Sequence, residues 1–209
     1  MRTATINYEV YKYNELSEQA KEKAKQWYLE RQEPCVFSEM VKEDLNCLFG
    51  KNALDVQYSL SYCQGDGLNI YGEIDAATIF ECLEEHNGGT QLAEFENVLT
   101  DKEKRTIMHY ASECNMIKIP MNRHYCYSLA DYIDIAEDWG YDLECYSEYE
   151  NINLEVLVKF EQLVRNMFHK LCRSYEKWGY EFFYEISDEE MEEMCEANGY
   201  EFLEDGTVF

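Results

Sequence analysis

The stretch LDVQYSLSYCQGDGLNIYGEI, residues 54–74, has the pattern of two β-strands joined by a tight turn. Apolar and polar side chains alternate over 54–62 and again over 68–74, which is the two-residue period of a strand with one buried face. Between them, the segment QGDG at 64–67 places two glycines where a reversing chain needs positive φ. The stretch therefore predicts a β-hairpin, around which the rest of the fold is arranged.

Helices are predicted on both sides of the hairpin, because apolar residues recur there at helical spacing. Capping residues precede several of these segments, and two of the caps are followed three residues later by the glutamate of a capping box. The expected N-caps are Ser17, Asp75, Thr100 and Ser187. The expected helices run from 17 to a stop at Pro34, then over 38–49, 76–86, 100–114, about 152–178 and 187–197.

Further strands are expected at 3–12, 116–119 and 123–135. Together the pattern predicts an α+β fold: a mostly antiparallel β-sheet packed against several helices, with one long helix near the C-terminus. Two prolines and no Ser/Gly-rich linker interrupt the 209 residues. A single compact domain over 1–209 is therefore predicted, with a subdivision into 1–89 and 90–209 as the alternative.

The negative charge is the strongest functional clue. The formal net charge is −25, and three stretches without any Lys or Arg (52–101, 124–158 and 178–209) hold 30 of the 43 acidic side chains. Solubility needs a net charge of only about 2–8 in a small domain. Such a surface repels nucleic acid and membranes and attracts basic protein faces, so a basic nucleic-acid-binding protein is the expected partner.

No motif predicts a metal centre, a cofactor or catalysis. The nine cysteines are scattered without a CxxC pair, the four histidines are far apart, and no phosphate-binding loop is present. The expectation is therefore a protein that is not an enzyme, with no metal and no cofactor. Reduced thiols and the absence of a long apolar run predict a cytoplasmic location and no membrane contact.

Three segments of the chain resemble a widespread family of phage and prophage proteins. They are YKYNELSEQAKEKAKQWY (11–28), YSLSYCQGDGLNIYGEI (58–74) and ISDEEMEEMCEANGYEFLEDGTVF (186–209). The resemblance covers roughly a third of the chain and carries over no catalytic residue. It implies a virus or mobile element as the source and a bacterial host cell as the location. It also favours an anti-defence role, because small acidic phage proteins without enzymatic motifs often counteract host defence.

The QGDG turn is one candidate site. Gln64 and Asp66 could contact a partner, because flanking glycines let a partner backbone approach closely. Asp66 could instead expose a carboxylate for a metal or for catalysis. The structural alternative is that the glycines and the aspartate do no more than close the turn.

The acidic stretches provide two candidate partner-binding faces, although solvated helix faces are their simpler explanation. Rows of carboxylates could occupy a basic channel as duplex DNA does, since affinity for such a channel depends largely on phosphate charge. The prediction is an inhibitor of a host defence nuclease, either a CRISPR effector or a restriction enzyme, that mimics DNA without binding it. The first face comprises Asp131, Asp134, Glu137, Asp138, Asp142 and Glu144. The second comprises Asp188, Glu189, Glu190, Glu192, Glu193 and Glu196.

Three other hypotheses stay open at the level of sequence. One is a small metal-dependent enzyme organised around Asp66. Another is a phage accessory protein whose charge only keeps it soluble. A third is an inhibitor that binds its nuclease away from the DNA channel and acts allosterically.

Overall fold

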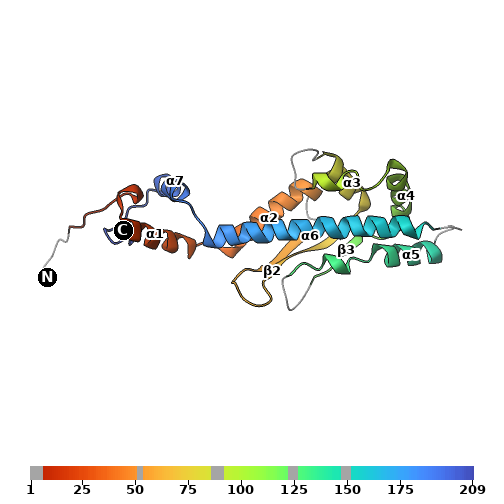
Figure 1. Ribbon diagram of the computed structural model, residues 1–209, viewed down its shortest axis with the longest axis horizontal. Helices are drawn as coiled ribbons and strands as arrows, with labels where there is room; N and C mark the ends of the chain where they lie inside the picture. The colour runs from red at the N-terminus through yellow and green to blue at the C-terminus, as the bar shows by residue number, and fades with distance from the viewer. Residues whose placement is uncertain (1–6, 51–53, 86–91, 122–126, 147–151) are drawn as a thin grey trace, which may run out of the picture. The chain divides into compact units, whose positions relative to one another are not determined.

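The computed structural model describes residues 7–50, 54–85, 92–121, 127–146 and 152–209 (Figure 1). Within them, seven α-helices accompany one three-stranded antiparallel sheet, which confirms the predicted α+β fold with a long helix near the C-terminus. The chain forms two compact units. Unit 1 comprises Met1–Val36 and Trp178–Phe209, and unit 2 comprises Phe37–Lys177.

The predicted hairpin forms the centre of the sheet in unit 2. Strand β1 (Leu54–Ser59) pairs antiparallel with β2 (Gly67–Ile74), and β3 (Ile117–Ile119) adds to the other edge of β2. The register places Val56 opposite Ile70 and Gly72 opposite Ile119. In β1 the two-residue period places Leu54 and Val56 on the buried face, whereas all of residues 67–70 in β2 are buried, including Asn69.

Four helices accompany the sheet in the sequence of unit 2. These are α2 (Pro34–Phe49), α3 (Ala76–Glu85), α4 (Asp101–Ala111) and α5 (Ile135–Tyr146), with short 3-10 turns at Ala93–Phe95 and Ala130–Tyr132. The helix α6 (Leu154–Tyr184) supplies the fully buried centre of the core. Its core side chains are Leu157, Phe160, Val164, Met167, Phe168 and Leu171, and those of β2 are Leu68 and Ile70.

Unit 1 combines both ends of the described chain. It contains a 3-10 turn at Tyr13–Glu15, α1 (Glu18–Leu29) and α7 (Asp188–Asn198). Single bridges join Tyr11 to Phe202 and Phe202 to Val208. The buried residues of its core are Tyr13, Leu16, Ala20, Ala24, Met191, Cys195 and Phe202.

The predicted caps are confirmed by their hydrogen bonds. Ser17 accepts from the Ala20 N–H at 3.3 Å, and Asp75 accepts from the Thr78 N–H at 2.8 Å. Thr100 and Ser187 both form complete capping boxes. These caps satisfy backbone donors that a helix start would otherwise leave without a partner.

Three predicted boundaries are wrong. Pro34 begins α2 instead of ending the preceding helix, because proline fits the first helical position, where its missing N–H costs nothing. Residues 127–134 contain a 3-10 turn and no strand, while 122–126 of the same expected strand lie outside the described residues. The long helix continues to Tyr184, six residues past its predicted end.

Two further predictions concern the N-terminus and the domains. Of the strand expected at 3–12, residues 1–6 lie outside the described part of the chain and 7–12 contribute only the Tyr11 bridge. The compact units divide after Val36 and after Lys177, and these divisions fall inside helices α2 and α6. The alternative subdivision into 1–89 and 90–209 stays a prediction. The single domain over 1–209 stays a prediction.

Candidate functional site: two acidic helix faces and a hairpin turn

The carboxylate of Asp66 closes the hairpin loop. Its Oδ1 accepts from the Ser59 hydroxyl at 2.8 Å and from the Cys63 thiol at 3.0 Å. Its Oδ2 accepts from the backbone N–H groups of Ser61 at 2.5 Å and Cys63 at 2.9 Å. These hydrogen bonds hold the pKa of Asp66 well below its usual range, and the bond from the Cys63 thiol has the largest effect. The carboxylate is therefore used by the loop itself.

The turn thus supports the structural alternative for Asp66. Among the described residues, no group of three or more His, Cys, Asp or Glu side chains is arranged to hold a metal ion. Gln64 is exposed beside Asp66 and stays available for contact. Cys63 is exposed as well, but its hydrogen bond to Asp66 raises the pKa of its thiol, so it is a poor nucleophile at neutral pH.

The first acidic face, which we call the α5 face, is held in place by α6. The Oε2 of Glu161 accepts from the Ala136 N–H at 2.8 Å, at the first turn of α5. The Nε of Arg165 donates to the Ile133 carbonyl at 2.9 Å. Glu161 is 9 % exposed, and the 2.8 Å ion pair with Arg165 compensates its burial. Glu161 and Arg165 of α6 therefore hold the chain in place at the start of α5.

Half of the α5 face is occupied by internal partners. Asp131 lies 2.8 Å from the Nε2 of His169, and Asp134 lies 3.1 Å from the guanidinium of Arg165. Asp142 accepts from the Asn115 amide at 2.9 Å. The neighbouring His169, first through its hydrogen bond, lowers the pKa of Asp131.

The other half points outward with its charge uncompensated. Glu137, Asp138 and Glu144 are exposed, and their side chains make no hydrogen bond or ion pair with other described residues. Two exposed aromatic side chains belong to the same segment: Tyr132, which precedes α5, is 68 % exposed, and Tyr141, between Asp138 and Glu144, is 62 % exposed. Tyrosine is enriched at protein interfaces whereas Asp and Glu are depleted there, so the exposed tyrosines are the interface-like part of this surface.

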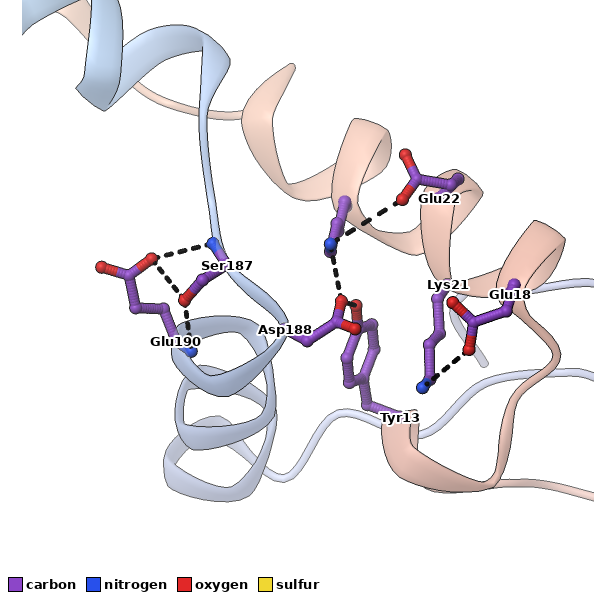
Figure 2. A network of polar contacts seen from close by, with 8 residues as sticks. Tyr13, Glu18, Lys21, Glu22, Ser187, Asp188 and Glu190 are labelled. Atoms are coloured by element: carbon purple, nitrogen blue, oxygen red, sulfur yellow. Dashed lines mark hydrogen bonds and ion pairs between the residues drawn. The ribbon is translucent and has the colours of Figure 1, made fainter.

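The second acidic face, the α7 face, belongs to unit 1 (Figure 2). Asp188 accepts from the Tyr13 hydroxyl at 2.7 Å and pairs with Lys25 at 2.6 Å. Figure 2 shows this contact between α7 and α1, with Ser187 and Glu190 forming the capping box beside it. Glu192 accepts from the Asn14 amide at 2.6 Å. Three of the six acids in this face therefore serve the packing of unit 1.

The contacts of Asp188, Glu190 and Tyr13 shift the pKa values of these three side chains. Lys25 and then Tyr13 lower the pKa of Asp188, and the Ser187 N–H lowers that of Glu190. Burial, followed by the Asp188 hydrogen bond, raises the pKa of the Tyr13 hydroxyl far above its usual range. The lowered pKa values mean that Asp188 and Glu190 stay charged as they hold α7 in place, and the raised pKa of Tyr13 keeps its hydroxyl protonated as the donor.

The other three acids of the α7 face form a stripe. Glu189, Glu193 and Glu196 are exposed, and none of their side chains has a hydrogen bond or ion pair among the described residues. Their spacing of four and three residues places them on one side of the helix. At 1.5 Å per residue, successive members are separated by about 6 Å and about 4.5 Å along the axis.

Sequence reasoning identified both faces but could not separate paired acids from unpaired ones. For Glu190 the signal was present, since the capping box assigns its carboxylate to the Ser187 backbone. For Asp188 and Glu192 there was none, because Tyr13 and Asn14 are distant in sequence. Sequence reasoning also missed Tyr62, the exposed residue of the hairpin loop with the most unusual backbone.

No protein-family model matches this chain, and neither a curated protein nor a solved structure matches it. Among the described residues, no helix combines the length and the apolar character needed to cross a membrane. Function is therefore inferred from the geometry of the two faces and the loop.

Proposed function

We propose that this protein inhibits a host defence nuclease by placing unpaired carboxylates in its nucleic-acid-binding channel. The observation that carries the proposal is the stripe of Glu189, Glu193 and Glu196 on α7. Like charges at this spacing destabilise a helix, and only Glu189, in the first turn of α7, is favoured by the helix dipole. Glu193 and Glu196 therefore add repulsion to the helix without a compensating contact. A basic channel in a partner would turn that cost into attraction.

The spacing of the stripe suits such a channel. One strand of duplex DNA presents a phosphate about every 3.4 Å of axis, and the stripe presents a carboxylate about every 4.5–6 Å. The α5 face adds Glu137, Asp138 and Glu144 in the same manner. Affinity for a channel that reads phosphate charge requires no base contacts, so a protein surface of this kind can compete with DNA.

The internal ion pairs strengthen the proposal. Basic side chains are few, and several of them are already bound to acids: Lys23 to Asp205 at 2.7 Å and Lys159 to Glu103 at 2.8 Å. These ion pairs neutralise part of the positive charge of the chain, while the side chains of the stripe acids make no ion pair among the described residues. Asp66, whose carboxylate closes its own loop, gives no support to the alternative of a metal-dependent enzyme.

Affinity capture from the lysate of a bacterium that carries defence nucleases tests the proposal. The full chain is immobilised at low salt, and bound proteins are eluted with duplex DNA and then with increasing salt. We expect one CRISPR effector or restriction enzyme to be displaced by duplex DNA and to cut DNA less well in the presence of the chain. Recovery of the nuclease without competition from DNA would indicate allosteric inhibition, and recovery of no nuclease would exclude the proposal for that host.

Charge reversal then locates the binding face. The pair Glu189→Lys and Glu193→Lys should weaken inhibition by about tenfold or more, because each change puts a repulsive charge in the channel. The pair Glu137→Lys and Glu144→Lys tests the α5 face in the same way. The matched control is Glu201→Lys with Glu204→Lys, which alters the same net charge at exposed positions of unit 1 outside α7. Unchanged inhibition by both face variants would contradict charge mimicry.

A further inference from the structure

The loop between β1 and β2 holds a tyrosine in a backbone conformation that tyrosine seldom adopts. Tyr62 has φ 56°, the only positive φ of a residue other than glycine in the described chain. Side chains with a Cβ are disfavoured in this left-handed region, which glycine or asparagine would occupy more readily. Such a residue persists only where its surroundings impose it, and strained residues of this kind cluster at functional sites.

The carboxylate of Asp66 helps to hold the backbone on both sides of Tyr62. Asp66 accepts hydrogen bonds from Ser59, Ser61 and Cys63, which are the residues on both sides of Tyr62. The Asp66 N–H also donates to the Cys63 carbonyl at 3.2 Å. At the base of the loop, Ser59 is paired with Gly67 at the end of the β1–β2 ladder. The loop is therefore stiff, although it lies at the end of a hairpin.

The stiff loop presents the tyrosine to solvent. Tyr62 is 69 % exposed, whereas Leu60 two residues earlier is 6 % exposed and anchors the loop in the core. Figure 1 shows the loop that precedes β2 projecting from the sheet. Tyrosine is enriched among the few residues that dominate protein interfaces, and holding it rigid before binding reduces the entropy lost on association.

We propose that Tyr62 is a preformed anchor that inserts into an apolar pocket on a partner protein. A projecting loop cannot enclose a small molecule, because small-molecule sites are concave. A nucleic acid or a membrane surface is repelled by a chain with a net charge of −25. The remaining partner is a protein whose pocket accepts a phenol ring, with Gln64 as a neighbouring polar contact.

This anchor differs from the α5 face in its position along α6 and in the type of interaction it would make with a partner. The α5 face meets α6 at Glu161 and Arg165. Burial first, and then the nearby charge of Asp66 in the loop, raises the pKa of Glu176, which lies fifteen residues after Glu161 on the same helix. That separation is about 22 Å along the axis. Burial of a ring is also insensitive to salt, unlike attraction between charges. The inference rests on the proposed function only in taking the partner to be a bacterial protein.

The test uses the full chain and two substitutions at position 62. Tyr62→Asn removes the ring but suits the left-handed backbone, so its melting temperature should equal or exceed that of the wild type. Tyr62→Phe keeps the ring and loses only the hydroxyl. The control is Tyr132→Asn, because Tyr132 is equally exposed at 68 % but has no positive φ. Tyr132 lies beside Asp131 in the α5 face, so its loss should matter only at low salt.

Capture from bacterial lysate at about 0.5 M NaCl, where exposed charges are largely screened, measures the anchor alone. We expect wild type, Tyr62→Phe and Tyr132→Asn to retain a protein that Tyr62→Asn retains about tenfold less. The same protein should form a photo-crosslink with p-benzoylphenylalanine placed at position 62 and none with the crosslinker at 132. If Tyr62→Asn also lowers the melting temperature, its loss of binding could come from unfolding. The anchor is then tested by the retention of the protein by Tyr62→Phe and by the crosslink from position 62.

Two results would overturn the anchor. One is that the wild type retains no protein at high salt, and the other is that Tyr62→Asn retains as much as the wild type does. Both leave the charge proposal standing, because that proposal is judged from DNA-displaced binding at low salt. Conversely, a salt-resistant partner lost in Tyr62→Asn, without any nuclease displaced by DNA, would support the anchor and remove the charge mimicry.

Discussion

Gly206 has two independent reasons to be glycine. Its φ is +81°, and a Cβ at this position would collide with the carbonyl of Ala20 in α1. Gly206→Ala should therefore lower the free energy of unfolding of unit 1 by about 2–4 kcal/mol, the sum of backbone strain and overpacking. Denaturant unfolding followed by circular dichroism measures the change.

Gly199 is the matched control for this prediction. It caps α7 in unit 1 with φ +68°, but no atom lies within 4 Å of a Cβ built there. Gly199→Ala should cost only the conformational strain, about 1 kcal/mol. Equal losses in the two variants would show that the close approach to Ala20 contributes nothing.

A second prediction at the residue scale concerns Asp66. Asp66→Asn keeps the shape of the side chain but leaves fewer acceptor positions for the donors of Ser59, Ser61 and Cys63. We expect the melting temperature to fall by several degrees. Gln64→Ala, in the same loop at an exposed position, should leave it unchanged. Differential scanning calorimetry measures the melting temperature of both variants. If the melting temperature of Asp66→Asn equalled that of the wild type, the Asp66 carboxylate would contribute nothing to holding the loop.

At the level of elements, Glu103 joins α4 to α6. Its carboxylate accepts from the Thr100 N–H at 2.7 Å and from Lys159 at 2.8 Å, and Lys159 chiefly lowers its pKa to about 2 from an ordinary 4.5. Because the folded pKa is the lower one, the contribution to stability is complete above pH 4.5. It is lost as the pH falls from about 4.5 to about 2.

Glu103→Gln tests this contribution. Glutamine can still serve the capping box but cannot pair with Lys159, so the variant should be less stable than wild type at pH 7. The difference should shrink between pH 4.5 and pH 2, where the wild-type carboxylate becomes protonated. Urea midpoints measured at pH 7, 4 and 2.5 give the comparison. A difference that does not change with pH would show that the ion pair has no net effect.

The elements that sequence predicted best are those whose signals are local. The hairpin at 54–74 and the caps at Ser17, Asp75, Thr100 and Ser187 depend on neighbours within a few residues. Helix α5 was missed, although Ile135, Trp139 and Leu143 recur at four-residue spacing and are all buried. The apolar residues of 123–135 suggested a strand because alternation over a short run cannot distinguish a strand from a coil that packs on a helix.

The candidate sites show the same division. Local sequence was enough to place two acidic faces, since carboxylate runs are visible directly. It could not show that Asp188 pairs with Lys25 or that Asp131 meets His169, because both contacts depend on tertiary packing. The left-handed backbone of Tyr62 was equally hidden, since the residue continued the alternating pattern of a strand.

For the whole molecule, the net charge of −25 predicts an unusual response to salt. Exposed like charges repel within the compact state, and salt screens that repulsion with a Debye length of about 10 Å at 0.1 M. Raising NaCl from about 0.02 M to about 0.5 M should therefore raise the melting temperature by several degrees. The variant Glu189→Lys with Glu193→Lys should gain less. A melting temperature that falls with salt would show that the internal ion pairs outweigh the repulsion.

Unit 1 also determines the order in which the chain can fold during synthesis. Its core joins Tyr13 and Ala20 to Met191 and Phe202. The ribosome synthesises the first pair early and the second pair near the end of the chain. Unit 2, over Phe37–Lys177, is complete before those later residues emerge. The apolar side of α1 is therefore exposed until the C-terminal residues of unit 1 have been synthesised. During that interval we expect chaperones to bind it.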